Sequence, residues 1–380
     1  MPFTSLGLSP ALLKALADQN YTQPYPIQTE VIPAILKKRD VLGIAKTGSG
    51  KTAGYVLPIL MNLQGKTVPK NRHVNVLVVV PTRELAMQVS EVFITFASAL
   101  PDRVKTLAVF GGVSINPQMM ALQNVNVLVA TPGRLLELVE SKAVHLSDIE
   151  TLVLDEADKM LNLGFREEMS LIFKLLPKKR QNLLFSATLN DDVTRINQIL
   201  LQNPIVIKID QKVDTFDLIS QLGYFVSEEN KGPLLRYLIK HNDMKQVLVF
   251  ASSVYKADNI ADKLRKNGIK ATAIHSKKSQ GARTEALSKF KSGELRVLVA
   301  TDLISRGIDI QFLPYVINYE LPRSPKDYIH RIGRTGRAES PGEAISLISP
   351  EDKQHFRVIQ KKMGKWVTMI ESETIDLHGF

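Results

Sequence analysis

Short apolar runs rich in β-branched residues alternate with longer amphipathic stretches along most of the chain. In the first half these runs are residues 41–44, 76–80, 104–109, 127–130, 152–154 and 182–185, and in the second half they are residues 247–250, 271–274, 297–300, 316–319 and 344–348. Such runs are typical of parallel strands that are buried on both faces of a sheet. The stretches between them indicate helices, for example the apolar-periodic run that follows residues 81–84 and extends to Leu100.

A polar stretch with little helical periodicity separates the two halves. It contains Asp210, Lys212, Asp214 and Asp217. We therefore predict an N-terminal domain over residues 1–206, a short linker over 207–221 and a C-terminal domain over 222–380. Alternation of strand and helix in each half predicts two tandem α/β domains with doubly wound parallel sheets. Ligands of such sheets gather at the carboxyl ends of the strands.

Composition and charge narrow the class of protein. Of the 380 residues, 44% are hydrophobic and 23% charged, a balance that supports sizeable cores and excludes a disordered chain. The net charge of +11 favours polyanionic partners, although solubility alone also explains it. The absence of cysteine excludes disulfides and thiolate metal sites. We find neither a secretory signal nor an apolar run long enough to cross a bilayer, and expect a soluble, cytoplasmic protein without membrane partners.

The first apolar run leads into a loop of small residues and then a helix. Residues 45–52 read Ala-Lys-Thr-Gly-Ser-Gly-Lys-Thr. Gly48 and Gly50 allow the backbone N–H groups to point at phosphate oxygens, Lys51 can reach the β- and γ-phosphates, and the Thr52 hydroxyl can bind Mg²⁺. The helix N-terminus adds its positive dipole end. Ala45 stands where the general pattern has a glycine, and the alternative is an ordinary tight turn before a helix.

Two adjacent carboxylates close the run at 152–154. Asp155 and Glu156 follow it directly. A buried strand that ends on two carboxylates is costly unless a cation lies there, and a hydrated Mg²⁺ between Asp155 and phosphates supplies one. Glu156 is then placed to take a proton from an attacking water. Without the phosphate loop, an acidic tetrapeptide indicates only a solvated loop or a helix start.

An arginine cluster lies in the second half. Arg331, Arg334 and Arg337 fall within residues 330–337 and are separated by glycines. Cations of this kind stabilise the charge that develops on a γ-phosphate, and an arginine supplied by the second domain would act only when the domains close. A basic nucleic-acid patch is the alternative interpretation of the same residues.

The order of these motifs resembles the DEAD-box RNA helicases, which take their name from the tetrapeptide found here at residues 155–158. The resemblance covers roughly residues 3–350. Further motifs similar to those of the family are residues 21–28, 81–86, 111–112, 131–134, 186–188, 300–302, 306–309 and 330–337. The resemblance implies two tandem RecA-like domains and an ATP-dependent, RNA-stimulated unwinding activity.

The resemblance also implies a role for each matching residue. For ATP and Mg²⁺, Gln28 would read the adenine edge near Phe3 and Tyr21, the loop residues Thr47, Gly48, Ser49, Gly50, Lys51 and Thr52 would hold the phosphates, Thr52 and Asp155 would hold the metal, Glu156 would be the base, Asp309 would touch the ribose, and Arg334 and Arg337 would be arginine fingers. Ser186, Thr188 and His330 would couple hydrolysis to strand separation. Arg83, Gly112, Thr131, Arg134, Gln280, Arg283 and Thr301 would line the RNA path, with ordinary turn or capping chemistry as the alternative for each.

Finer features point to a subgroup and to departures from the family pattern. Residues 110–118 and 278–283 resemble the bacterial RhlE-type helicases. Lys46 stands where glutamine is common in the phosphate loop, and Tyr25 stands where the adenine element usually has threonine. Tyr25 either packs against the loop or alters nucleotide affinity. Neither change removes a group that hydrolysis requires.

The expected partner is single-stranded or duplex RNA, contacted mainly through its backbone. The motifs offer Thr, Gly and Arg rather than aromatic platforms, and aromatic content is only 6%, so we expect weak sequence readout and an affinity that falls with salt. A related DNA translocase and an RNA clamp without turnover are the competing hypotheses. Ribosomal precursors and the RNA-decay machinery are both candidate partners, and residues 350–380, which are mixed in charge, do not decide between them.

Overall fold

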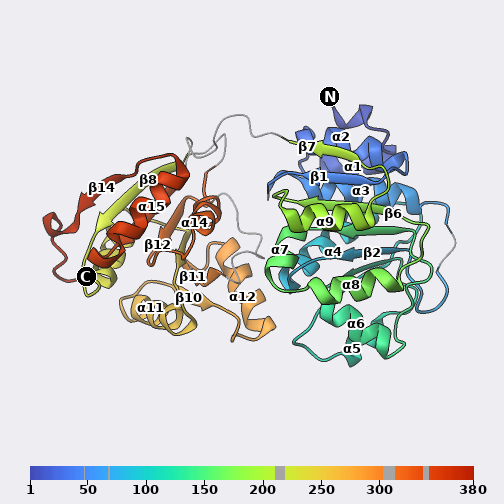
Figure 1. Ribbon diagram of the computed structural model, residues 1–380. Helices are drawn as coiled ribbons and strands as arrows, with labels where there is room; N and C mark the ends of the chain where they lie inside the picture. Colours follow the sequence, from blue (N-terminus) through green and yellow to red (C-terminus); the bar gives the residue numbers. More distant parts are fainter. Residues whose placement is uncertain (47, 67–68, 210–218, 303–312, 337–341) are drawn as a thin grey trace. The chain divides into compact units, whose positions relative to one another are not determined.

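The computed structural model describes residues 1–46, 48–66, 69–209, 219–302, 313–336 and 342–380. The chain divides into two compact units, Met1–Asp210 and Gln211–Phe380. Each unit is an α/β layer structure around one parallel sheet (Figure 1).

The first unit is built on a sheet with the strand order β3-β4-β2-β5-β6-β1-β7, in which all neighbouring strands are parallel. Its strands are β1 (Val41–Ile44), β2 (Val76–Val79), β3 (Thr106–Val109), β4 (Val127–Ala130), β5 (Thr151–Leu154), β6 (Gln181–Ser186) and β7 (Ile205–Lys208). Its helices are η1 (Phe3–Ser5), α1 (Pro10–Asp18), α2 (Pro26–Leu36), α3 (Lys51–Leu63), α4 (Arg83–Ala97), α5 (Asn116–Ala121), α6 (Pro132–Glu140), α7 (Ala157–Asn162), α8 (Arg166–Leu175) and α9 (Asp191–Leu200).

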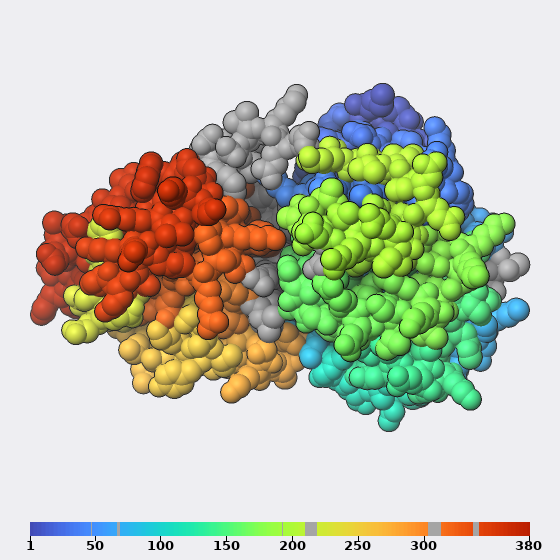
Figure 2. Space-filling view, in the orientation of Figure 1, coloured from blue at the N-terminus to red at the C-terminus, as the bar shows by residue number. Residues whose placement is uncertain are grey.

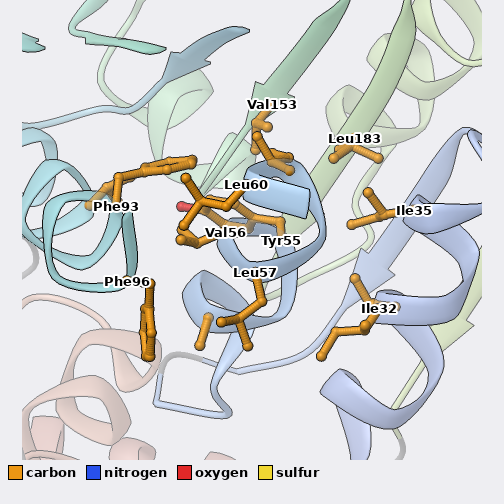
Figure 3. Close-up of a cluster of buried hydrophobic side chains, with 14 of the residues drawn as sticks. Ile32, Ile35, Tyr55, Val56, Leu57, Leu60, Phe93, Phe96, Val153 and Leu183 are labelled. Atoms are coloured by element: carbon orange, nitrogen blue, oxygen red, sulfur yellow. The ribbon is translucent and has the colours of Figure 1, made fainter. Parts of the chain in front are cut away.

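Alternate residues of each strand enter cores on opposite faces of this sheet. In β2, Val76 and Val78 pack with α1 to α4, whereas Leu77 and Val79 pack with α6 to α9. The first core surrounds Tyr55 of α3 (Figure 3). The Tyr55 ring lies 5.2 Å from that of Phe185. Burial of both faces is the reason why the strands read as continuous apolar runs.

The second unit repeats this plan with the strand order β10-β11-β9-β12-β13-β8-β14, again parallel between neighbours. Its strands are β8 (Ile219–Phe225), β9 (Val247–Phe250), β10 (Ala271–Ile274), β11 (Val297–Ala300), β12 (Tyr315–Asn318), β13 (Gly342–Ile348) and β14 (Thr368–Glu371). Its helices are α10 (Lys231–His241), α11 (Val254–Lys266), α12 (Gln280–Lys291), α14 (Pro325–Ile332), η2 (Pro350–Asp352), α15 (Lys353–Met363) and η3 (Ser372–Thr374). The predicted fold class, two doubly wound parallel α/β domains, is confirmed.

The strand predictions were incomplete at the edges of both sheets, and the predicted linker was too long. Residues 207–208 belong to β7 and residues 219–221 belong to β8, so the linker prediction of 207–221 was wrong at both ends. Ile207 and Ile219 are buried, and β7 and β8 pair with the largely buried strands β1 and β13, which outweighs the polar residues around them. The remaining part of that prediction, 210–218, lies outside the described residues.

Candidate functional site

The phosphate-loop candidate connects β1 to α3 and requires glycine at two points. Gly48 and Gly50 have φ angles of 83° and 85°, a left-handed conformation that side chains disfavour. A Cβ atom on Gly50 would also lie 2.6 Å from the Gln28 side-chain nitrogen and 2.7 Å from the Tyr25 ring. The loop is therefore packed closely against the start of α2. Thr47 lies outside the described residues.

The Lys51 side chain curls back beneath this loop. Its Nζ donates to the carbonyl oxygens of Ala45 at 2.6 Å and Lys46 at 2.9 Å. Burial lowers the pKa of Lys51, while the nearby Asp155 and Glu156 carboxylates oppose that effect. A buried ammonium at the first turn of α3 gives the loop a cationic floor suited to phosphate.

Asp155 lies at the end of β5, where its carboxylate is held from two sides. The Tyr55 hydroxyl donates to one carboxylate oxygen at 3.0 Å, and the backbone N–H of Glu156 donates to the other at 2.8 Å. Burial raises the pKa of Asp155, and the attraction of Lys51 counteracts part of that rise. The charge of this carboxylate is thus costly in the protein alone and would be relieved by a cation.

Glu156 occupies a strained position with an unsatisfied oxygen. Its φ of 53° is left-handed, uncommon for a glutamate. Oε1 accepts from Lys159 Nζ at 2.6 Å, whereas Oε2 is buried without a hydrogen-bond partner among the described residues. A buried carboxylate oxygen without a donor is expensive, so a water or another ligand has a place to bind there.

The loop between β6 and α9 is connected to the same acidic segment. Ser186 Oγ donates to the Thr188 carbonyl at 2.7 Å, and Thr188 Oγ1 donates to Asp158 at 2.9 Å. The backbone N–H of Ala45 donates to the Ser186 carbonyl at 3.0 Å. Because β5, β6 and β1 are adjacent, the ends of three strands bring the loop, the acidic residues and Ser186 together.

Gln28 is fully buried and bridges two backbone segments. It accepts from the Tyr25 N–H at 2.9 Å and donates to the Gly50 carbonyl at 2.9 Å. Phe3 is buried in the first core, and the Tyr21 ring packs edge-on against Phe96 with centroids 5.7 Å apart. The structure thus brings Gln28 to the phosphate loop, and places Phe3 and Tyr21 in packing contacts.

Several of the predicted RNA residues of the first unit gather at the carboxyl ends of β2, β3 and β4. A Cβ atom on Gly112, whose φ is 75°, would lie 1.9 Å from the Arg83 guanidinium. Arg134 donates to the Val113 carbonyl at 2.8 Å and pairs with Glu137 at 2.8 Å. Thr131 directly precedes α6. The glycine loop after β3 therefore lies between two arginines.

In the second unit, a buried arginine joins the motif at residues 300–302 to the motif at residues 330–337. Arg331 of α14 makes a bidentate ion pair with Asp302, at 2.6 Å and 2.8 Å, and donates to the Glu320 carbonyl at 2.6 Å. Thr301 precedes Asp302, and Arg334 lies two residues after the end of α14. One residue pair thus connects the segment after β11 to the arginine cluster.

The other predicted residues of this unit are distributed as follows. Gln280 and Arg283 lie in the first turn of α12, which Ser279 caps by accepting from Ala282 N–H at 3.3 Å. His330 lies in α14. Asp309 and Arg337 lie outside the described residues.

Sequence reasoning missed three residues that hold the site in shape. Tyr55 lies four residues after Lys51, so both residues lie on the same side of α3. That spacing is the sequence signal that could have identified Tyr55. Arg331 and Asp302 were read only as parts of motifs, because nothing in the sequence pairs residues so far apart.

Comparison with known proteins agrees with this arrangement. The DEAD/DEAH box helicase model matches residues 25–196, and the helicase conserved C-terminal domain model matches residues 230–339. The DEAD-box ATP-dependent RNA helicase RhpA of Helicobacter pylori is 39% identical over 376 residues, which cover 98% of this chain and 75% of the relative.

Solved structures show the same fold. Dbp5 of S. cerevisiae bound to RNA and ADP BeF3 is 29% identical, with a TM-score of 0.83 over 98% of this chain and 96% of that one. A DEAD box protein from Methanococcus jannaschii is 35% identical, with a TM-score of 0.55 over 97% and 99% of the two chains.

The first of the two α/β units, each built on a parallel sheet, carries a phosphate loop beside a buried acidic strand end. This arrangement is the site of a nucleotide-hydrolysing enzyme. The chain belongs to the DEAD-box ATP-dependent RNA helicases. It is therefore an ATP-hydrolysing helicase that binds RNA, and the family prediction is confirmed. Among the helices of the described ranges, none has the length and apolar character that a bilayer crossing requires.

Proposed function

We propose that this helicase holds ATP in its first unit and hydrolyses it when bound RNA draws the second unit against the nucleotide. The observation that carries the proposal is the convergence of three adjacent strand ends. The Lys51 ammonium, the Asp155 carboxylate and the unsatisfied Glu156 oxygen all lie at the same edge of one sheet.

In this proposal the first unit supplies nearly all of the binding chemistry. Gly48, Ser49 and Gly50 present backbone N–H groups to the phosphates, and Lys51 exchanges its carbonyl partners for phosphate oxygens. In this proposal, Gln28, Phe3 and Tyr21 bind the adenine, with Thr47 completing the loop.

Mg²⁺ is the metal that these residues would hold. The fit rests on Asp155, a buried carboxylate with no ion pair to any residue that the structure describes, and on Thr52 at the start of α3, which interacts with the same Tyr55 hydroxyl that donates to Asp155. When bound, the ion would neutralise charge on the β- and γ-phosphates.

Glu156 is the proposed base for the attacking water. Oε2 is buried and free of partners among the described residues, so it can accept a hydrogen bond from that water, while Lys159 fixes Oε1. Its strained backbone holds the carboxylate in one orientation, a common feature of catalytic positions.

The second unit supplies groups that act only on closure. Arg334 and Arg337 stabilise the charge that develops on the γ-phosphate, Asp309 binds the ribose, and His330 meets the segment of Ser186 and Thr188. The buried Arg331–Asp302 pair supports the proposal because it ties the arginine cluster to Thr301, a proposed RNA contact.

RNA is proposed to run along the carboxyl ends of strands in both units, in contact with its phosphates and 2′-hydroxyls. Arg83, Gly112, Thr131 and Arg134 form the first part of the path, and Gln280, Arg283 and Thr301 form the second. Closure bends one strand and separates it from its complement. A cytoplasmic role on ribosomal precursors or in RNA decay, in the RhlE-type subgroup, remains part of the proposal.

The experiment compares ATP turnover with single-stranded RNA and DNA of the same sequence, together with displacement of a short RNA duplex. We expect stimulation by RNA, and a Glu156→Gln variant that binds ATP and RNA but hydrolyses very slowly; the exposed Glu167→Gln is the matched control. Equal stimulation by DNA would favour a translocase, and RNA binding without stimulated turnover would favour a clamp.

A further inference from the structure

The last helix of the second unit separates apolar and basic residues onto two faces. In sequence, residues 350–380 are mixed in charge. In the structure, Phe356, Ile359 and Gln360 of α15 are buried against the core of that unit, while Arg357, Lys361 and Lys362 are exposed. α15 lies at the surface of its unit (Figure 1; Figure 2, red).

The outward face of α15 carries only positive charge. Lys353, Arg357 and Lys361 are spaced by four residues and so form one column, with Lys362 beside it. No aspartate or glutamate occurs from residue 353 to residue 370. Like charges four residues apart destabilise a helix. The helix dipole favours Lys361 and Lys362 in the last turn but does not account for Arg357 in the middle.

Three of these cations are available to a partner. Arg357, Lys361 and Lys362 have no ion pair with any residue that the structure describes. Lys353 differs, because its Nζ lies 4.3 Å from the centre of the Phe225 ring and belongs to the packing of the fold.

A large exposed aromatic residue follows these cations in the chain. Trp366 is the only tryptophan in the chain, and 73% of its surface is exposed. Gly364 ends α15 in a left-handed conformation with φ of 72°, and the Val367 N–H donates to Gln360 at 2.8 Å. This bond holds the segment that carries Trp366 against the last turn of α15, the turn that contains Lys361 and Lys362.

We propose that this outward face of α15 and Trp366, together the α15 surface, form a second contact for single-stranded RNA. Arg357, Lys361 and Lys362 bind successive phosphates, and Trp366 stacks on one unpaired base. Cationic side chains combined with an exposed aromatic ring are the general means of binding single strands without sequence preference. A protein partner fits less well, because lysine is depleted at protein interfaces. The inference rests on the RNA binding of the helicase but not on the proposed catalytic roles.

Trp366 provides the direct test, because it is the sole tryptophan. Single-stranded RNA is titrated into the full chain without ATP while tryptophan fluorescence is recorded. We expect saturable quenching, and Trp366→Ala should weaken RNA binding at least about fivefold. Replacement of Arg357, Lys361 and Lys362 by Ala should weaken binding further and reduce the slope of log affinity against log salt by about two.

The matched control removes three exposed cations from α11 and its following loop, with Lys263, Lys266 and Lys270 changed to Ala. Circular dichroism melting of all variants verifies folding. Unchanged fluorescence at saturating RNA, or equal RNA affinity of the two triple variants, would overturn the α15 surface. If RNA stimulates turnover of the wild type but does not quench Trp366 fluorescence, only this inference is refuted. If RNA quenches the fluorescence of the wild type but does not stimulate its turnover, only the proposed catalytic cycle is refuted.

Discussion

The side-chain amide of Gln28 donates a hydrogen bond of 2.9 Å to the carbonyl oxygen of Gly50. The same side chain accepts from the backbone N–H of Tyr25 over 2.9 Å. One buried residue of α2 therefore determines how the phosphate loop lies against the proposed adenine-binding segment. In the proposed function, this side chain would connect recognition of the base with recognition of the phosphates.

Removal of that side chain should loosen the loop. In Gln28→Ala, the Tyr25 N–H loses its partner inside the protein and the Gly50 carbonyl keeps only its hydrogen bond from the Gly54 N–H, which costs about 1–3 kcal/mol of stability. We expect at least a tenfold loss of ATP affinity, measured by titration with a fluorescent nucleotide, and a lower melting temperature. The exposed Gln23→Ala is the control, and an ATP affinity equal to that of this control would refute the connection.

Tyr25 contributes to the same contact through its ring, which is half exposed and lies against Gly50. The sequence left open whether it packs on the loop, and the structure confirms that it does. Tyr25→Thr opens the space above Gly50 and should speed ADP release several-fold, as measured by stopped-flow displacement. Tyr25→Phe keeps the ring and should release ADP at the wild-type rate. Equal effects of the two substitutions would assign the role to the hydroxyl instead.

The buried carboxylate of Asp155 predicts a pH-dependent stability. Because burial raises the pKa of Asp155, the folded protein binds this proton more tightly than the unfolded chain does. Ionised Asp155 therefore lowers the free energy of unfolding. This loss of stability grows as the pH rises from the ordinary aspartate pKa, about 4, through the raised pKa. Without nucleotide, Asp155→Asn should gain stability relative to the wild type over that window.

Urea unfolding at several pH values measures this difference, with the exposed Asp18→Asn as the control that shows no such trend. Addition of ATP and Mg²⁺ should reverse the order, since only the wild type gains stability from the ligands. A difference between Asp155→Asn and the wild type that stays constant with pH would contradict the burial argument.

The Arg331–Asp302 pair predicts a loss that charge alone does not repair. Arg331→Lys keeps the positive charge but cannot make the two parallel hydrogen bonds, so we expect about 2 kcal/mol lower stability of the second unit. The value is modest because the Asp302 side chain is 33% exposed. RNA-stimulated turnover should fall as well. Chemical unfolding and ATPase rates measure both, and wild-type stability in Arg331→Lys would show that the bidentate geometry is unimportant; the exposed Arg323→Lys is the control.

The fold was largely predictable because the central strands are buried on both faces. Their runs, such as residues 41–44 and 127–130, match the observed strands end to end. The edge strands β7 and β14 were missed because each is only four residues long, is partly exposed and has polar residues at its ends, Lys208 in β7 and Thr368 and Glu371 in β14. β8 was missed because the polar residues Ser220 and Gln221 interrupt its apolar pattern, although the strand pairs along its whole length with β13.

The candidate site was predictable where its residues are contiguous and not where they meet through the fold. Residues 45–52 and 155–158 are sequence motifs, so the sequence alone predicts their chemistry. The Tyr55 hydrogen bond to Asp155 and the Arg331 pair with Asp302 depend on which helices cross which strand ends. No local pattern encodes that, and it was the structure that brought these partners together.

The central claim is that ATP is held by one unit and used only with the other, and single-turnover hydrolysis of prebound ATP in Arg334→Ala tests it most directly. With saturating RNA, the account predicts ATP affinity within about twofold of wild type but a hydrolysis rate at least about a hundredfold lower. The control is Arg323→Ala, two residues before α14 in the same unit, and it should behave as wild type. An Arg334→Ala protein that hydrolyses prebound ATP at the wild-type RNA-stimulated rate would contradict the claim.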